Sequence, residues 1–224
     1  MRFIHFGPVI GGVVISPVLC KELLERGRQT TVSHTQQLAG HLDKENLFPD
    51  KDKHWFVENF KQYFIPYFRK IQDQHDPLFY YAVHPFKKCM IQNLWINFMK
   101  AGEYNPPHTH SGSYSFVLFL QVPEEIKKES ADFKGIGPGP GHIRFKYGEE
   151  QPEIMTKHSI LPVANEMWIF PASLYHSVPP FKSDVERISV SGNILLTEGV
   201  GVKNTPTYEG GELSFITDKA EFNI

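Results

Sequence analysis

The sequence predicts an α+β, mainly β fold: a jelly roll with N-terminal helices packed on one face. Helical periodicity is confined to the first third of the chain, and after residue 85 apolar and polar residues alternate with a period of two. Aromatic residues make up 13% of the chain, and Gly and Pro number 17 each, which favours strands and ordered turns over a helical bundle. Helices followed by many short strands indicate an α+β domain with a jelly-roll core.

The first third of the chain is expected to contain a strand region and two helices. Residues 3–15 are apolar and contain a double-glycine turn, so we interpret them as one or two strands. Ser16, followed by a proline, is expected to cap a first helix, and Gly27 is expected to end it. Aromatic residues recur at spacings of three and four over residues 54–71, which predicts a second helix, kinked at Pro66.

The remainder of the chain is predicted to form short strands. In one of them Phe116 and Leu118 are expected on one face, with Val117 and Phe119 on the other. Residues 124–142 are charged at first and then rich in Gly and Pro, so we interpret them as an inserted loop without regular structure, a mobile lid over one mouth of the barrel. The predicted strands are 89–99, 113–122, 143–147, 158–163, 166–170 and 187–196.

We expect residues 1–224 to form a single domain. Its parts are a helical support over residues 1–85, a jelly-roll core over 86–197 and a C-terminal tail over 198–224. A chain of 224 residues is long enough to bury a sizeable core without a disulfide scaffold.

Composition also limits the partners and the compartment. A net charge of −2 gives no electrostatic case for a nucleic-acid or anionic-membrane partner. Apolar runs stay well below the length that spans a membrane. Cys20 and Cys89 are too few for a disulfide framework, so we interpret them as reduced thiols and expect a cytoplasmic protein.

Three histidines indicate a metal site. His108 and His110 lie two residues apart, and in a strand such spacing places both side chains on one face. His176 follows an apolar strand 66 residues later. The pair alone is also compatible with exposed loop histidines, and the other eight histidines are scattered, so we interpret those as structural or exposed.

A basic residue in an apolar strand suggests an anion site. Arg187 stands among apolar and small residues, with Ser189 on the same strand face. A buried arginine is rare unless it binds an anion or a carboxylate. The alternative is an ion pair between Arg187 and a neighbour such as Asp184 or Glu186.

Taken together, these motifs resemble those of the iron(II)/2-oxoglutarate-dependent oxygenases. The His-x-His pair, a distal histidine that opens a strand and an Arg-x-Ser on the next strand carry the resemblance. The surrounding segments NPPHTHSGSYSFVLFLQVP and IFPASLYHSVPPF resemble the prolyl-4-hydroxylase-like subgroup of the type found in marine phages and bacteria. The resemblance covers residues 90–195, and the family fold, a double-stranded β-helix, agrees with the predicted strands.

The resemblance implies Fe(II) and 2-oxoglutarate as cofactors. His108, His110 and His176 match the metal ligands of the catalytic site. Arg187 matches the residue that binds the far carboxylate of 2-oxoglutarate, and Ser189 is expected to support it.

Two positions depart from the family pattern. Phe119 stands where a tyrosine often contacts the same carboxylate, so Ser115 or Asn97 is expected to substitute for it. His110 occupies the place of a carboxylate ligand, usually Asp. Either three histidines bind the metal, or two do and a water or Glu103 takes the third position.

The activity implied is that of a dioxygenase that converts 2-oxoglutarate and O2 to succinate while it hydroxylates an unidentified substrate. The resemblance suggests a peptidyl side chain as that substrate. One alternative is a three-histidine cupin-type metalloenzyme that does not use 2-oxoglutarate, which leaves Arg187 unexplained unless the substrate is an acid. Another is a non-catalytic jelly-roll binding or structural protein, which leaves the convergence of histidines and arginine unexplained.

Overall fold

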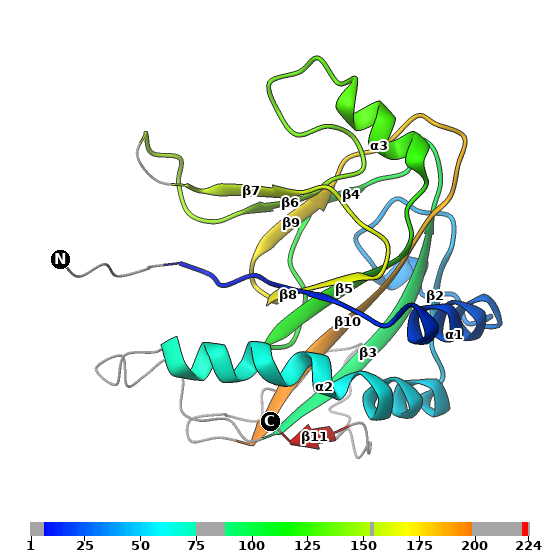
Figure 1. Cartoon of the computed structure of the whole chain (residues 1–224), viewed down its shortest axis with the longest axis vertical. Coiled ribbons are helices and arrows are strands. Elements are labelled where there is room, and N and C mark those ends of the chain that lie inside the picture. Colours follow the sequence, from blue (N-terminus) through cyan, green and yellow to red (C-terminus); the bar gives the residue numbers. More distant parts are fainter. Residues whose placement is uncertain (1–6, 75–87, 153–154, 199–220, 224) are drawn as a thin grey trace.

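The computed structural model describes residues 7–74, 88–152, 155–198 and 221–223. Two antiparallel sheets face each other, and two helices cover the outer face of the larger sheet (Figure 1). This confirms the mainly β jelly roll with helices on one face. The helices are α1 (Pro17–Arg28), α2 (Asp50–Gln74) and α3 (Glu124–Ala131), with a short 3-10 turn at Thr35–Gln37.

Among the described residues, the larger sheet has seven strands. Their order is β1-β8-β5-β10-β3-β11, and β2 pairs with β3 beside the main path. The long strands β3 and β10 pair along almost their whole length, so they form the rigid centre of the sheet. The bounds are β1 (Gly11–Val14), β2 (Glu45–Leu47), β3 (Lys88–Met99), β5 (Tyr114–Gln121), β8 (Glu166–Pro171), β10 (Arg187–Glu198) and β11 (Glu221–Asn223).

In the part of the chain that the structure describes, the smaller sheet has four strands in the order β4-β9-β6-β7. It lies opposite the larger sheet, as Figure 1 shows, and together they enclose the interior of the jelly roll. The bounds are β4 (Asn105–His108), β6 (Ile143–Lys146), β7 (Lys157–Ile160) and β9 (Tyr175–Val178).

Strand β5 separates two apolar cores. Phe116 and Leu118 pack toward α1 and α2, whereas Val117 and Phe119 pack between the two sheets, as the alternation predicts. The ring of Phe116 stacks on Phe56 of α2 with ring centroids 5.4 Å apart. Burial of such rings contributes a few kcal/mol each, so the aromatic face of α2 fastens the helix to the sheet.

The first helix begins as expected but does not end as expected. Ser16 is its N-cap residue, although its side chain makes no capping hydrogen bond. Gly27 lies inside α1 and is buried, and a Cβ there would collide with Ile96 on β3. The glycine therefore permits close approach of helix and sheet instead of ending the helix.

The expectation that residues 124–142 lack regular structure is also wrong. Residues Glu124–Ala131 form α3, because Ile126 is fully buried beneath it and two glutamates in its first turn suit the helix dipole. Beyond α3, Phe133 and Ile136 are exposed, so they do not pack the following loop onto the core.

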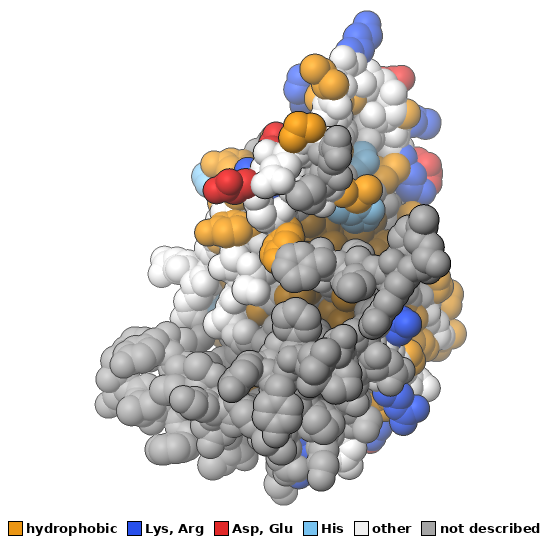
Figure 2. Space-filling view, turned by 90° about the vertical axis from the view of Figure 1, so that its left-hand side faces the viewer, with side chains coloured by type: hydrophobic (Ala, Val, Ile, Leu, Met, Phe, Trp, Pro, Cys, Tyr) orange, Lys and Arg blue, Asp and Glu red, His pale blue; other side chains and the backbone are white. Residues whose placement is uncertain are grey.

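Several expectations lie outside the described residues. They include the start of the opening strand at residues 3–6 and most of the tail over 198–224. The single-domain boundaries at 85 and 197 therefore stay a prediction. Within the described part of the chain, no helix is long and apolar enough to cross a membrane. In the upper part of the face in Figure 2, both basic and acidic side chains are present.

Candidate metal and cosubstrate site

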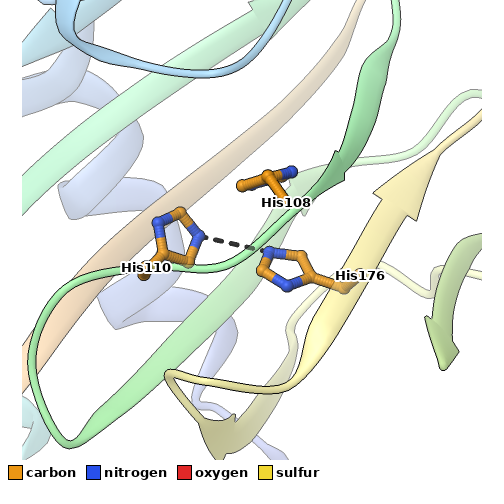
Figure 3. A group of neighbouring side chains, drawn as sticks. All are labelled: His108, His110 and His176. Atoms are coloured by element: carbon orange, nitrogen blue, oxygen red, sulfur yellow. Dashed lines mark hydrogen bonds between the residues drawn. The ribbon is translucent and has the colours of Figure 1, made fainter. Parts of the chain in front are cut away.

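The smaller sheet brings the three predicted histidines together. His108 ends β4 and lies directly opposite His176 on β9. His110 follows β4, and its backbone N–H donates to the carbonyl of Ala172 at 2.9 Å, which holds it beside the other two. One ring nitrogen from each residue lies within 4.8 Å of the others, and the three side chains converge in Figure 3.

Backbone carbonyls determine which ring nitrogens can bind a metal. Nδ1 of His108 donates to the carbonyl of Pro106 at 2.7 Å, and Nδ1 of His176 donates to that of Leu174 at 3.0 Å. Because Nδ1 carries the proton in both rings, each Nε2 keeps a free lone pair. Such a hydrogen bond is the usual device that orients a metal-binding histidine.

Burial keeps these imidazoles neutral. It lowers the pKa of His108, and together with the neighbouring histidines it lowers the pKa of His110 to about 3 and that of His176 to about 4. A neutral imidazole is the form that coordinates a metal, so all three are in the binding form at neutral pH.

The spacing of the nitrogens fits a divalent ion. Nε2 of His110 and Nε2 of His176 are 3.2 Å apart, along the dashed line in Figure 3. Two nitrogens that each lie about 2.1 Å from an octahedral ion, at a right angle, are about 3.0 Å apart. The three residues present could therefore hold a divalent ion such as Fe(II).

Arg187 lies in the same cavity as the histidines. Arg187 is 3% exposed, its Nη1 donates to the carbonyl of Gly141 at 3.0 Å, and its Nε has no partner among the described residues. The guanidinium lies over the ring of Phe119, 5.6 Å from the centroid, and burial lowers its pKa to about 10. Among the described residues no carboxylate pairs with it, so the ion pair with Asp184 or Glu186 does not form.

Of the expected supporting residues, Ser189 and Asn97 line the cavity. They face each other across β10 and β3, and Nδ2 of Asn97 donates to Oγ of Ser189 at 3.3 Å. Ser115 does not line the cavity, because its hydroxyl donates to Oδ1 of Asn193 at 3.0 Å. A polar wall thus runs from Arg187 to Asn97 along the larger sheet.

The carboxylate weighed as a third ligand points elsewhere. Oε1 of Glu103 accepts from the N–H of Asp43 at 2.8 Å, and Oε2 accepts from the N–H of Lys100 at 2.7 Å. Glu103 is therefore a clamp between two loops, and it does not line the cavity.

The structure adds cavity residues that the sequence analysis missed. Glu45 of β2 lines the cavity and is 2% exposed, although nothing in a three-residue polar strand signals burial. Trp95 lines it too, with its ring 5.6 Å from that of His110. The period of β3 could have found Trp95, because it lies two residues before Asn97 and so shares its strand face.

Apolar side chains close the cavity between the sheets. Phe170 packs on the ring of His176, with centroids 4.9 Å apart. The other apolar lining residues include Val117, Phe119, Ile143 and Val178. Their burial keeps the interior at low dielectric, where a charged hydrogen bond to Arg187 is strong.

The comparisons with known proteins concern the same part of the chain. Residues 93–193 match a family model described as "Putative 2OG-Fe(II) oxygenase". A search of the curated proteins finds no match to the chain.

Similar solved structures include a Pseudomonas putida prolyl-4-hydroxylase, with 13% identity over 84% of this chain and 93% of that chain at a TM-score of 0.49. The non-heme alpha ketoglutarate dependent epimerase SnoN from nogalamycin biosynthesis has 14% identity over 92% and 91% of the two chains, with a TM-score of 0.48. An oxidoreductase of the 2OG-Fe(II) oxygenase family from Burkholderia pseudomallei has 16% identity over 50% of this chain, with a TM-score of 0.35. The present chain covers 45% of that oxidoreductase.

The family match includes all three histidines and Arg187, and the donor set in the cavity suits the cofactors of that family. Residues 93–193 therefore match a 2OG-Fe(II) oxygenase domain, and the residues in the cavity fit Fe(II) and 2-oxoglutarate.

Proposed function

We propose that the protein is a 2-oxoglutarate-dependent hydroxylase in which His108, His110 and His176 bind Fe(II) and Arg187 binds 2-oxoglutarate. The observation that carries the proposal is a buried arginine, without a carboxylate partner among the described residues, in the same cavity as three converging histidines. Fe(II), when bound, would supply the activation of O2 that oxidises 2-oxoglutarate to succinate and CO2 and inserts oxygen into a C–H bond of the substrate.

The histidine end of the cavity is built to hold a cation. Hydrogen bonds to the carbonyls of Pro106 and Leu174 fix two of the rings before any metal arrives. This preorganisation lowers the entropy cost of binding, and it aims the nitrogen lone pairs at one point. Three neutral ligands leave the full charge of the ion available to attract an anionic cosubstrate.

The arginine end is built to hold an anion. A planar guanidinium with a free Nε presents a donor geometry that matches a carboxylate. The hydroxyl of Ser189 and the amide of Asn97 lie on the neighbouring wall and offer further polar contacts. A dicarboxylate whose other end reaches the histidines satisfies both ends of the cavity, and 2-oxoglutarate has this shape.

The primary substrate is proposed to bind in a second cavity, which shares the histidine end of the first cavity. A second cavity of about 210 Å³ adjoins the first. Trp95, His108 and His110 line both cavities, so a substrate there would lie against the metal end. The peptidyl side chain suggested by the sequence resemblance stays a prediction.

Oxygen consumption tests the proposed function without knowledge of the substrate. We expect purified protein loaded with Fe(II) to consume O2 and form succinate slowly when 2-oxoglutarate is present. Without 2-oxoglutarate, consumption should fall to the background of free Fe(II). Consumption that is independent of 2-oxoglutarate would favour the three-histidine enzyme that does not use it.

Paired histidine variants identify the site in the same assay. His176→Ala removes a buried ring of the converging group, and His158→Ala removes an exposed ring of β7. We expect His176→Ala to lose Fe(II) binding and succinate formation, whereas His158→Ala should match the wild type. Equal behaviour of the two variants would contradict the proposed metal site.

A further inference from the structure

The cavity contains a buried carboxyl group that the proposed mechanism does not use. Glu45 is 2% exposed and lines the cavity together with the three histidines and Arg187. Its Oε2 is buried and has no hydrogen-bond partner in the part of the chain that the structure describes. Nor does any described cation pair with it. An unpaired buried carboxylate is costly, so its presence in a ligand cavity indicates a cation or donor that arrives with the ligands.

Neighbouring contacts hold Glu45 in place. Its strand pairs with β3, which places Glu45 opposite Asn97, and its backbone N–H donates to Oγ1 of Thr35 at 3.2 Å. Its carbonyl accepts from the backbone N–H of His34 at 2.7 Å. The backbone is thus fixed on both sides, whereas the carboxyl group keeps a free oxygen.

The charges of the proposed site do not balance without Glu45. Sites of this chemistry ordinarily bind iron through two histidines and one carboxylate, and here His110 occupies the carboxylate position. A dipositive ion, the cationic Arg187 and a doubly negative cosubstrate leave one positive charge in excess when all three ligands are neutral. Such an excess is expensive in a cavity closed by apolar side chains.

We propose that Glu45, in its ionised form, supplies the negative charge that His110 does not, and that it stabilises the bound metal from the cavity wall without being one of its three histidine ligands. This inference rests on the proposed function. Glu45 is then a positioning residue that acts through the field in the cavity. The negative charge that a carboxylate ligand ordinarily provides would here come from a residue of β2 that does not bind the metal.

The electrostatic surroundings of Glu45 agree with this role. Burial and the nearby charge of Glu103 raise its pKa to about 7, so without a cation the group is largely neutral in mildly acidic solution. The other charged or titratable groups on the cavity wall are Arg187 and the three histidines. A divalent ion in the cavity lowers the pKa of Glu45 by Coulomb attraction, and metal binding then releases its proton.

Anaerobic calorimetry with Fe(II) alone tests the inference. We compare wild-type protein with Glu45→Gln, which keeps the shape and loses the charge, and with Glu25→Gln, which removes an exposed glutamate from α1. We expect Glu45→Gln to weaken Fe(II) binding about tenfold or more, and Glu25→Gln to have no effect. Glu45→Asp, which keeps the charge, should recover part of the affinity.

The number of protons released gives a second readout. Titrations at pH 7 in two buffers of different ionisation enthalpy measure it directly. We expect the wild type to release about half a proton more than Glu45→Gln, since a group with a pKa about 7 is half protonated there.

The outcomes separate the inference from the proposed function. If the wild type binds Fe(II) through His176 but Glu45→Gln shows the same affinity and proton count, the inference is overturned and the metal site stands. If the wild type itself binds no Fe(II), or His176→Ala binds it equally well, the proposed function fails and the inference fails with it. Weaker binding together with a smaller proton count in Glu45→Gln supports the inference, provided its circular dichroism matches the wild type.

Discussion

Two arginines in this molecule show how a structural cation differs from one that awaits a ligand. Arg26 in α1 has its partners inside the protein: it binds Glu22 at 2.7 Å and Asp52 at 2.8 Å, and its guanidinium lies 4.2 Å from the ring centroid of Trp55. Arg187 is more deeply buried, yet it has one backbone carbonyl as a hydrogen-bond acceptor and an unpartnered Nε.

Arg187, whose burial costs more free energy, has fewer polar partners among the described residues than the more exposed Arg26. Burial of a guanidinium without a carboxylate costs free energy that packing alone does not return. The cost is sensible where a ligand supplies the missing carboxylate, as a cavity lined by three histidines suggests for Arg187. Arg26, by contrast, joins α1 to α2 and needs no ligand.

The largest expected effect is the loss of Fe(II) binding when His110 is removed, because the ligand that Arg187 awaits is expected to bind a metal held by the histidines. We expect His110→Ala to weaken Fe(II) binding about 100-fold or more, as His108→Ala and His176→Ala should, because each removes a nitrogen ligand. Anaerobic calorimetry of the three variants measures this. His110→Asp should keep binding and turnover, provided that the shorter side chain reaches the metal. If His110→Ala binds Fe(II) as the wild type does, His110 lies outside the ligand set.

Arg187 should determine cosubstrate binding and spare the metal. We expect Arg187→Ala to weaken 2-oxoglutarate binding about 100-fold, since a desolvated guanidinium–carboxylate pair contributes several kcal/mol. Quenching of Trp95, which lines the cavity, can report binding, and Fe(II) affinity should stay within about twofold. Arg187→Lys should recover only part, because an ammonium lacks the two-pronged donor geometry. Arg69→Ala, an exposed arginine of α2, is the control. If Arg187→Ala binds 2-oxoglutarate normally, Arg187 does not bind the cosubstrate, and its contrast with the structural Arg26 fails.

Sequence periodicity predicted the long strands that carry the site, but it did not predict all of the residues that line the cavity. The alternation of β5 places Val117 and Phe119 inside and Phe116 outside, because one residue of shift would expose the whole apolar face. The histidine pair was recognisable from its two-residue spacing, and Arg187 was recognisable because a basic residue is unusual among apolar and small strand residues.

Elements without internal periodicity escaped prediction. β2 has three residues, and its glutamate becomes buried only through pairing with β3, 52 residues later at Asn97. β4 and β9 have four residues each and are flanked or interrupted by prolines, so neither shows a strand pattern. α3 is short and mostly charged, and its one buried anchor, Ile126, gives no repeat to detect. Tertiary contacts, not local preference, determine all four elements.

Glu45 provides a pH test of an unpartnered charge in the same cavity. Because its folded-state pKa is raised to about 7, the stabilisation from the protonated carboxyl is fully present below the unfolded pKa, near 4.5, and is lost as pH rises through about 7. We therefore expect metal-free wild type to lose about 1–3 kcal/mol relative to Glu45→Gln between pH 4.5 and pH 8. Urea unfolding at several pH values measures the difference, in which the contributions of the histidines cancel. A difference that does not change with pH would show that Glu45 is not strained by burial.

Substitution of Arg26 should give the smallest effect, and it should change folding stability instead of ligand binding. Its guanidinium is partly exposed, so the ion pairs with Glu22 and Asp52 are screened by water, although Asp52 is buried and loses its one strong partner. We expect Arg26→Ala to lower the free energy of unfolding by about 1–2 kcal/mol, through the lost pair and the lost contact with Trp55. Urea unfolding measures this loss, and 2-oxoglutarate binding should be unchanged at a temperature where the variant is folded.

Arg187→Ala is expected to lose 2-oxoglutarate binding without a loss of stability. Removing a buried charge without a carboxylate partner relieves desolvation and leaves stability equal or higher. If Arg26→Ala weakened 2-oxoglutarate binding as much as Arg187→Ala, both losses would reflect a damaged fold and neither arginine could be assigned to the cosubstrate.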